Sequence, residues 1–219
     1  MFDPFTCRSL HTCINQGTQD TKREYTAYIG GVHEFKKHLL SCALKNGYGE
    51  YDKTIILSDG ATWIRNLREE LFPDAQQILG FYHLCENVNT FAKHVFGQEP
   101  SQYSGWAGEM CALLKASRHG EVLNELEKRR KPPLCPVDLR GYIQNNAFNI
   151  DYVRYIDDGL FIGSDAVESG NKCVLHQRLK QAGMRWNPQT AQYILSLRSK
   201  HKSGLWLREV ASIVLDFSS

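Results

Sequence analysis

Residues 54–82, TIILSDGATWIRNLREELFPDAQQILGFY, decide the fold of this chain. Residues 54–58 form a short, unbroken apolar run of β-branched type, which predicts a strand buried on both faces. A helix is predicted from about residue 63 to residue 71, because Pro73 stops it. Residues 78–82 predict a second buried strand. Strand, helix and strand within about 30 residues are typical of a right-handed βαβ unit, so the two strands should be parallel.

A potentially reactive residue follows each predicted strand. Asp59 comes directly after the first strand and His83 after the second. Carboxyl ends of neighbouring parallel strands meet at one edge of a sheet, and open α/β sheets bind their ligands at that edge. Asp59 followed by Gly60 is also ordinary turn chemistry, and an aspartate can cap the next helix. The residue alone therefore does not establish a site.

A second informative stretch is residues 163–186, GSDAVESGNKCVLHQRLKQAGMRW. It predicts a loop and then a helix that opens near Asp165 and stops at Gly183, with Glu168 in the first turn. A carboxylate at a helix entrance, followed by cations, suits an enzyme that holds a metal against a polyanion. A capping box formed by Asp165 and Glu168 explains the same pattern without a metal. Both interpretations stay open at this point.

The remaining segments complete a mixed α/β pattern. The sequence predicts, in chain order, a weak strand at 6–14, a turn at 15–18, a strand at 23–29, a helix at 32–46 capped by Gly47, an all-helical stretch at 84–158 with one helix at 139–155, and a last helix with Asn187 as N-cap and Pro188 in the first turn. The two strands are expected to pair as a hairpin, with Glu24 on the polar face of the second strand. We divide the chain accordingly into a poorly defined part (1–22), a first core part (23–83), a helical insertion (84–158) and C-terminal helices (159–219).

Composition narrows the protein class. No apolar run approaches the roughly 20 residues that cross a bilayer, and the first residues do not resemble a signal peptide, so we expect a cytoplasmic protein without a membrane partner. The seven cysteines are scattered and form no C-x-x-C pair, which fits free thiols. His83 and Cys85 lack a second pair at zinc spacing, so a structural zinc site is not expected.

Positive charge is concentrated near the C-terminal end. The net charge is only +2, but residues 172–208 contain no Asp or Glu. Such asymmetry is the electrostatic footprint of a protein that binds nucleic-acid phosphates, although Lys and Arg also suit a solvated helix face. The candidate DNA-binding residues are Lys172, Arg178, Lys180, Arg185, Trp186, Arg198 and Lys200.

Four blocks carry a family resemblance: ILSDGATWIRNLREELFPDAQQIL, FYHLCENV, IGSDAVESGNK and RLKQAGMRWNPQTAQYILSLR. In this order they resemble the DDE transposases of bacterial insertion sequences, nearest to the IS-Kra type, which is related to Mutator-like transposases. The resemblance runs from about Lys22 to the C-terminus. It implies an RNase H-like core interrupted by a helical insertion. It also implies an enzyme that cleaves phosphodiester bonds and transfers strands of double-stranded DNA, at the transposon ends and at the target. The reaction would take place in the bacterial cytoplasm.

The resemblance also implies roles for individual residues. Three acids of the family hold two Mg²⁺ or Mn²⁺ ions, which clamp the attacking and leaving oxygens. By position, Asp59 is the second acid and Glu168 the third, so both are expected catalytic residues and metal ligands. His83 is expected either to contact the scissile phosphate or to pack structurally. A homo-oligomer is an open expectation.

Departures from the family pattern limit this expectation. No strand with an acid matches the opening strand of the family, and neither Asp3 nor Asp20 has a strand context. Gly80 stands where relatives carry an acid, and Asp165 replaces a glycine. We therefore expect an incomplete RNase H-like α/β core in a truncated chain that is inactive alone. The alternatives are a transposase that obtains its first acid from residues 1–22 or from another subunit, and a non-enzymatic DNA-binding or interaction protein that uses residues 172–208.

Overall fold

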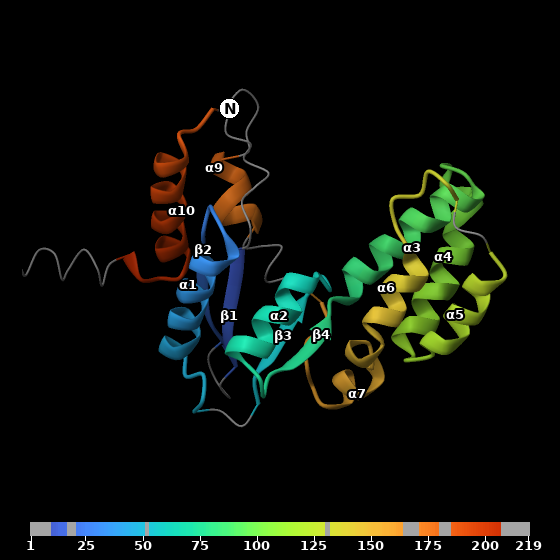
Figure 1. Ribbon diagram of the computed structural model, residues 1–219, viewed down its shortest axis with the longest axis horizontal. Helices are drawn as coiled ribbons and strands as arrows, with labels where there is room; N and C mark the ends of the chain where they lie inside the picture. The colour runs from blue at the N-terminus through green and yellow to red at the C-terminus, as the bar shows by residue number, and fades with distance from the viewer. Residues whose placement is uncertain are drawn as a thin grey trace, which may run out of the picture. The chain divides into compact units, whose positions relative to one another are not determined.

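The computed structural model describes residues 10–16, 21–50, 53–129, 132–163, 171–179 and 185–206. Two compact units divide the chain: residues 1–52 together with 165–219 form one, and residues 53–164 form the other. Helices predominate, and each unit contains a two-stranded sheet (Figure 1). The described residues therefore confirm a mixed α/β protein. None of their helices is both long enough and apolar enough to span a bilayer.

The first unit begins with a β-hairpin. Strand β1 (Leu10–Gln16) pairs antiparallel with β2 (Thr21–Ala27), and Leu10 lies opposite Ala27. The predicted hairpin is thus confirmed, but β1 extends into the predicted turn at 15–18. Helix α1 (Val32–Lys45) follows. Gly47 adopts φ +86° and donates its N–H to the Leu44 carbonyl oxygen at 3.1 Å, which confirms that it ends this helix.

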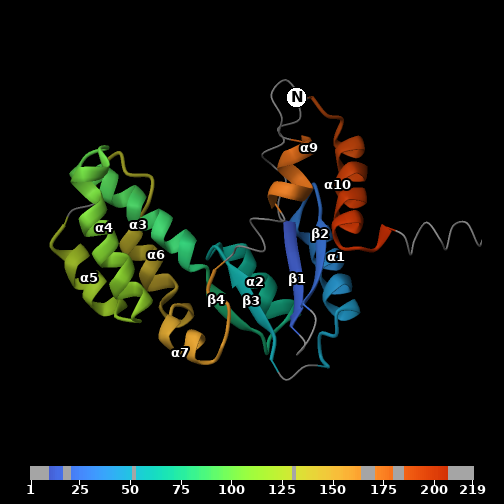
Figure 2. The same ribbon diagram turned by 180° about the vertical axis from the view of Figure 1, so that it is seen from behind.

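Helices cover the hairpin (Figures 1 and 2). Helix α10 (Pro188–Lys202) packs on β2 and on the π-helical segment η3 (Asn171–His176), which continues into α9 (Gln177–Leu179). Their shared core consists of Ala27, Val174, Leu175, Leu179, Ala191 and Leu195. The Asn187 side chain accepts a hydrogen bond from the Gln189 N–H at 2.9 Å, so the predicted N-cap is confirmed.

Two predictions for this unit need correction. The sequence predicts one α-helix from 165 to 183, of which the structure describes residues 171–179. Residues 171–176 have π-helical geometry, and only residues 177–179 are α-helical. Glu24, which the strand pattern assigned to a polar face, is only 8% exposed. Its carboxylate accepts a hydrogen bond from Asn46 Nδ2 at 2.8 Å, and this contact compensates for the loss of water.

The second unit opens with the expected βαβ unit. Strand β3 (Ile55–Ser58), helix α2 (Thr62–Leu71) and strand β4 (Gln76–Leu79) follow one another, and the strands pair in parallel with Leu57 opposite Ile78. The parallel pairing is confirmed. The prediction that β3 is buried on both faces is wrong. Its first three residues are only partly buried and, within the described residues, only β4 pairs with it.

The second strand ends earlier than predicted. Helix α3 (Phe81–Phe96) begins directly after Gly80, so residues 81 and 82 belong to a helix and not to β4. A buried stripe that includes Leu84 and Val88 explains the helix, because it repeats at helical spacing. His83 therefore lies in the first turn of α3 and does not directly follow a strand.

The rest of the second unit is helical, as predicted. Its elements are α4 (Pro100–Lys115), α5 (His119–Glu127), α6 (Leu139–Asn145), the 3₁₀ turn η2 (Ala147–Asn149) and α7 (Tyr152–Asp157). The prediction of one continuous helix at 139–155 is wrong, because α6, η2 and α7 divide this range. Asn146 Nδ2 donates to the Tyr142 carbonyl oxygen at 2.9 Å, and this side-chain hydrogen bond accompanies the end of α6.

Candidate functional site

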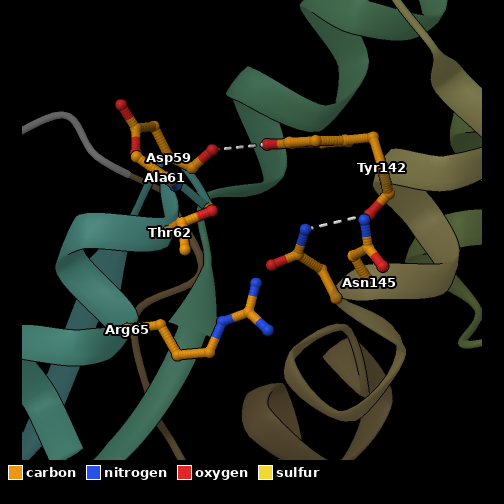
Figure 3. Close-up of a pocket in the computed structure, with 8 residues that line it drawn as sticks. Asp59, Ala61, Thr62, Arg65, Tyr142 and Asn145 are labelled. Atoms are coloured by element: carbon orange, nitrogen blue, oxygen red, sulfur yellow. Dashed lines mark hydrogen bonds between the residues drawn. The ribbon is translucent and has the colours of Figure 1, made fainter.

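An open pocket of about 340 Å³ lies at the carboxyl end of β3, where α2 begins and α6 approaches (Figure 3). Its lining residues come from the β3–α2 turn, the first turn of α2 and the end of α6. They are Asp59, Gly60, Ala61, Thr62, Arg65, Tyr142, Asn145 and Asn146. The predicted position of Asp59, at the carboxyl end of a parallel strand, is therefore confirmed.

The turn after β3 presents the Asp59 carboxylate to solvent. Asp59 is exposed, and its Oδ1 accepts a hydrogen bond from the Ala61 N–H at 2.9 Å. Gly60 between them has φ +79°, a left-handed conformation that glycine adopts without strain. The carboxylate points away from the Tyr142 ring (Figure 3). One carboxylate oxygen therefore orders the turn, while the group as a whole stays accessible to a ligand.

Two tyrosine hydroxyls join the helices to the ends of both strands. Tyr142 in α6 donates to the carbonyl oxygen of Asp59 at 2.6 Å, and Tyr152 in α7 donates to that of Leu79 at 2.9 Å. Burial raises the pKa of Tyr142 to about 12, and the nearby negative charge of Asp59 adds to this shift. The Tyr142 hydroxyl consequently keeps its proton and remains a donor at neutral pH.

Arg65 supplies positive charge to the pocket. It extends from the first turn of α2 into the pocket (Figure 3). No acid among the described residues forms an ion pair with it. A free guanidinium close to the start of a helix can hold an anionic oxygen, since the first backbone N–H groups of the helix lack intrahelical acceptors. The pocket thus combines one exposed carboxylate with one unpaired cation.

The metal site implied by the family resemblance needs more ligands than these. Within the described ranges, no group of three His, Cys, Asp or Glu side chains could hold a metal ion. Asp59 alone supplies a hard oxygen donor that Mg²⁺ accepts, but a two-metal centre requires several carboxylates. Glu168 and Asp165 lie outside the described residues. The donor set on the described part of the chain does not fit two metal ions.

His83 is separate from this pocket lining. Its Nδ1 lies 3.1 Å from Glu86 Oε2 one turn further along α3, and both side chains are partly exposed. A histidine and glutamate three residues apart on a helix surface form an ordinary local pair. The expected contact of His83 with a phosphate stays a prediction.

The candidate DNA-binding residues fall into different environments. Arg178, Arg185 and Lys200 are exposed. Trp186 is partly buried, and its indole Nε1 has no hydrogen-bond partner among the described residues. Lys180 and the side chain of Lys172 are outside the described part of the chain.

Arg198 has a structural task. Its guanidinium donates to the carbonyl oxygen of Val174 at 2.9 Å, to that of Cys173, and to Gln177 Oε1 at 3.2 Å. These bonds satisfy carbonyl groups of the irregular π-helical segment and hold it on α10. No local sequence signal distinguishes this arginine from its exposed basic neighbours, because its partners lie in a different segment of the chain.

Replacing Gly60 with alanine should destabilise the second unit by about 2 kcal/mol. Alanine at this position would have to keep the positive φ of Gly60. Its Cβ atom would lie 2.9 Å from Leu79 Cδ1 and 3.1 Å from the Asn146 amide. Urea denaturation would measure the loss. Gly108→Ala is the matched control, because Gly108 lies inside α4 with no atom within 4 Å of the added Cβ, and we expect it to be neutral or slightly stabilising. Equal effects would contradict the strained-turn interpretation.

Comparisons of the chain with protein-family models, with curated proteins and with solved structures gave no match.

Proposed function

We propose that this chain is a DDE-type transposase, or a remnant of one, that acts on double-stranded DNA and uses Asp59 and Glu168 as carboxylate ligands of Mg²⁺ or Mn²⁺. The observation that carries the proposal is the position of Asp59. Its exposed carboxylate follows β3 of a parallel strand pair, at the edge where α/β sheets bind ligands. An unpaired arginine in the same pocket suits a phosphate-containing substrate.

The order of elements supports an RNase H-like core. An antiparallel hairpin, a helix, a strand, a second helix and a parallel strand precede a long helical stretch, and the family resemblance implies such a helical insertion within the core. Strand β1 reads LHTCINQ and contains no acid, so it supplies no first carboxylate. With two acids assigned, we propose that the chain binds DNA but does not cleave it unaided.

A cleavage assay tests this proposal. Labelled duplex DNA is incubated with the protein and Mg²⁺ or Mn²⁺, and nicked and strand-transfer products are measured. We expect binding without products. Robust cleavage by the unmutated protein would contradict the proposal that the chain does not cleave DNA unaided. If Asp59→Ala abolished this cleavage, the result would still support Asp59 as a catalytic carboxylate. Cleavage that survives both Asp59→Ala and Glu168→Gln would refute the assignment of both acids.

The second candidate function is DNA binding without catalysis through residues 172–208. Arg178, Arg185 and Lys202 are exposed, and none of them pairs with an acid in the described residues. Unpaired cations can release counterions from DNA phosphates at little cost, because no internal ion pair has to break. Under this candidate, substitution of Asp59 and Glu168 leaves DNA binding unchanged.

Neutralising Arg178 and Arg185 together should reduce the salt dependence of DNA binding. Each phosphate contact contributes about 0.9 to the slope of log K against log salt, so the double substitution to glutamine should lower the slope by about 2. Fluorescence anisotropy at several salt concentrations would measure it. Arg118→Gln with Arg140→Gln is the matched control, since these exposed arginines already pair with Glu121 and Glu127. An unchanged slope in the test variant would remove these residues from the DNA interface.

A further inference from the structure

Helices α3 and α4 lie side by side in both views (Figures 1 and 2), and each carries one cysteine, Cys85 in α3 and Cys111 in α4. The register follows from contacts at either end. The Lys115 ammonium lies 5.9 Å from the centre of the Phe81 ring, and the Lys93 ammonium lies 5.3 Å from that of Tyr103.

These contacts define an antiparallel ladder with steps of four residues. Cys85 follows Phe81 by four residues in α3, and Cys111 precedes Lys115 by four residues in α4. A further eight residues in the same directions lead to Lys93 and Tyr103, which form the second observed contact. Residues four apart share one helix face, so the two cysteines occupy one rung of this ladder. Helix packing, and not sequence proximity, brings the two sulfurs together.

The two thiols are free and interact directly. Both cysteines are unpaired by disulfides and partly buried. Their side chains share a hydrogen bond, which lowers the pKa of Cys111 and raises that of Cys85. The Lys115 ammonium lies close enough to Cys85 to favour negative charge at the pair. A thiolate formed at either sulfur therefore has the other thiol beside it as a resolving group.

We propose that Cys85 and Cys111 form a reversible disulfide that joins α3 to α4, with a hydroperoxide as the oxidant. The thiolate of one cysteine attacks one oxygen of the hydroperoxide, the O–O bond breaks, and sulfenic acid forms with release of water or an alcohol after protonation. The sulfur of the other cysteine then attacks the sulfenic sulfur, and water leaves. Two thiols are oxidised by two electrons and one hydroperoxide is reduced. A dithiol reductant reverses the reaction.

This modification site is independent of the transposase proposal, because it requires neither DNA nor a metal. Its structural effect follows from its location. Helix α3 starts immediately after β4, so a covalent link to α4 secures the helix that follows this strand. Closing the chain between residues 85 and 111 should restrict the unfolded state and raise the melting temperature by roughly 5 °C.

Peptide mapping of the full chain tests the proposal. Trypsin should release residues 69–93 with Cys85 as their single cysteine and residues 94–115 with Cys111 as theirs. After hydrogen peroxide treatment and alkylation in denaturant, we expect these two peptides to be joined. Two of the seven thiols should be lost to alkylation. Dithiothreitol should restore both thiols and return the melting temperature to its original value.

Serine substitutions complete the test. Cys111→Ser should abolish the joined peptide and the shift in melting temperature. Cys135→Ser is the matched control, because Cys135 is a buried thiol that donates to the Val137 carbonyl oxygen at 3.4 Å, and it should leave both signals intact. Independent oxidation of Cys85 and Cys111 to sulfinic acids, or joining of Cys85 to other cysteines equally often, would overturn the proposal. Both readouts on the unmutated chain remain valid if a variant fails to fold.

Discussion

Substitution of Asp59 by asparagine should weaken Mn²⁺ binding at the candidate site by at least about tenfold. In the unmutated protein, paramagnetic Mn²⁺ should broaden the amide resonances of Gly60 and of Ser169 together, because Asp59 and Glu168 are proposed to bind the same ion. Asparagine keeps the shape of the side chain and an acceptor oxygen for the Ala61 N–H, but it removes the charge that attracts the cation. Both sets of resonances should therefore remain sharp in the variant.

Asp74→Asn is the control for this experiment. Asp74 is an exposed aspartate of the same unit, but it precedes β4 and lies at the amino end of the strand pair. Its substitution should leave the broadening unchanged. Broadening confined to the Asp59 turn would separate Glu168 from the metal and end the proposal of a shared site. Broadening spread over exposed acids would show only general attraction of cations.

Replacing Tyr152 with alanine should destabilise the second unit by about 4 kcal/mol. The side chain is completely buried, and its ring makes edge contacts with Phe81 at 5.2 Å and Tyr155 at 6.3 Å between ring centres. Its hydroxyl donates to the Leu79 carbonyl oxygen at the end of β4. Alanine leaves a cavity and one buried acceptor without this donor. A total stability of only about 5–15 kcal/mol makes such a loss severe.

Phenylalanine at position 152 separates the two contributions. Tyr152→Phe keeps the ring and removes only the donor, so it should cost about 1–2 kcal/mol. Tyr82→Ala is the matched control on the surface, because Tyr82 is 51% exposed, and its loss should be below about 1 kcal/mol. Urea denaturation with linear extrapolation would measure all three variants. Similar losses for Tyr152→Ala and Tyr82→Ala would contradict the central role of Tyr152.

The candidate site was predictable from sequence in one respect. The apolar run before Asp59 and the turn signal after it place a carboxylate at the end of a strand, and local patterns suffice for this conclusion. The prediction that His83 directly follows a strand was wrong, because the aromatic residues at 81 and 82 suit a strand and a buried helix equally well. Gly80 starts the helix there, and the stripe that continues through Val88 agrees with it.

Sequence alone determined the βαβ unit, the hairpin, the helical character of residues 84–158 and the position of Asp59, because each depends on periodicity within one segment. Only tertiary structure decided that Tyr142 bonds the carbonyl of Asp59, that Tyr152 bonds that of Leu79, and that Cys85 faces Cys111. The tyrosine contacts join residues 83 and 73 positions apart. No local pattern encodes such partners, since the packing of whole helices brings them within hydrogen-bond distance.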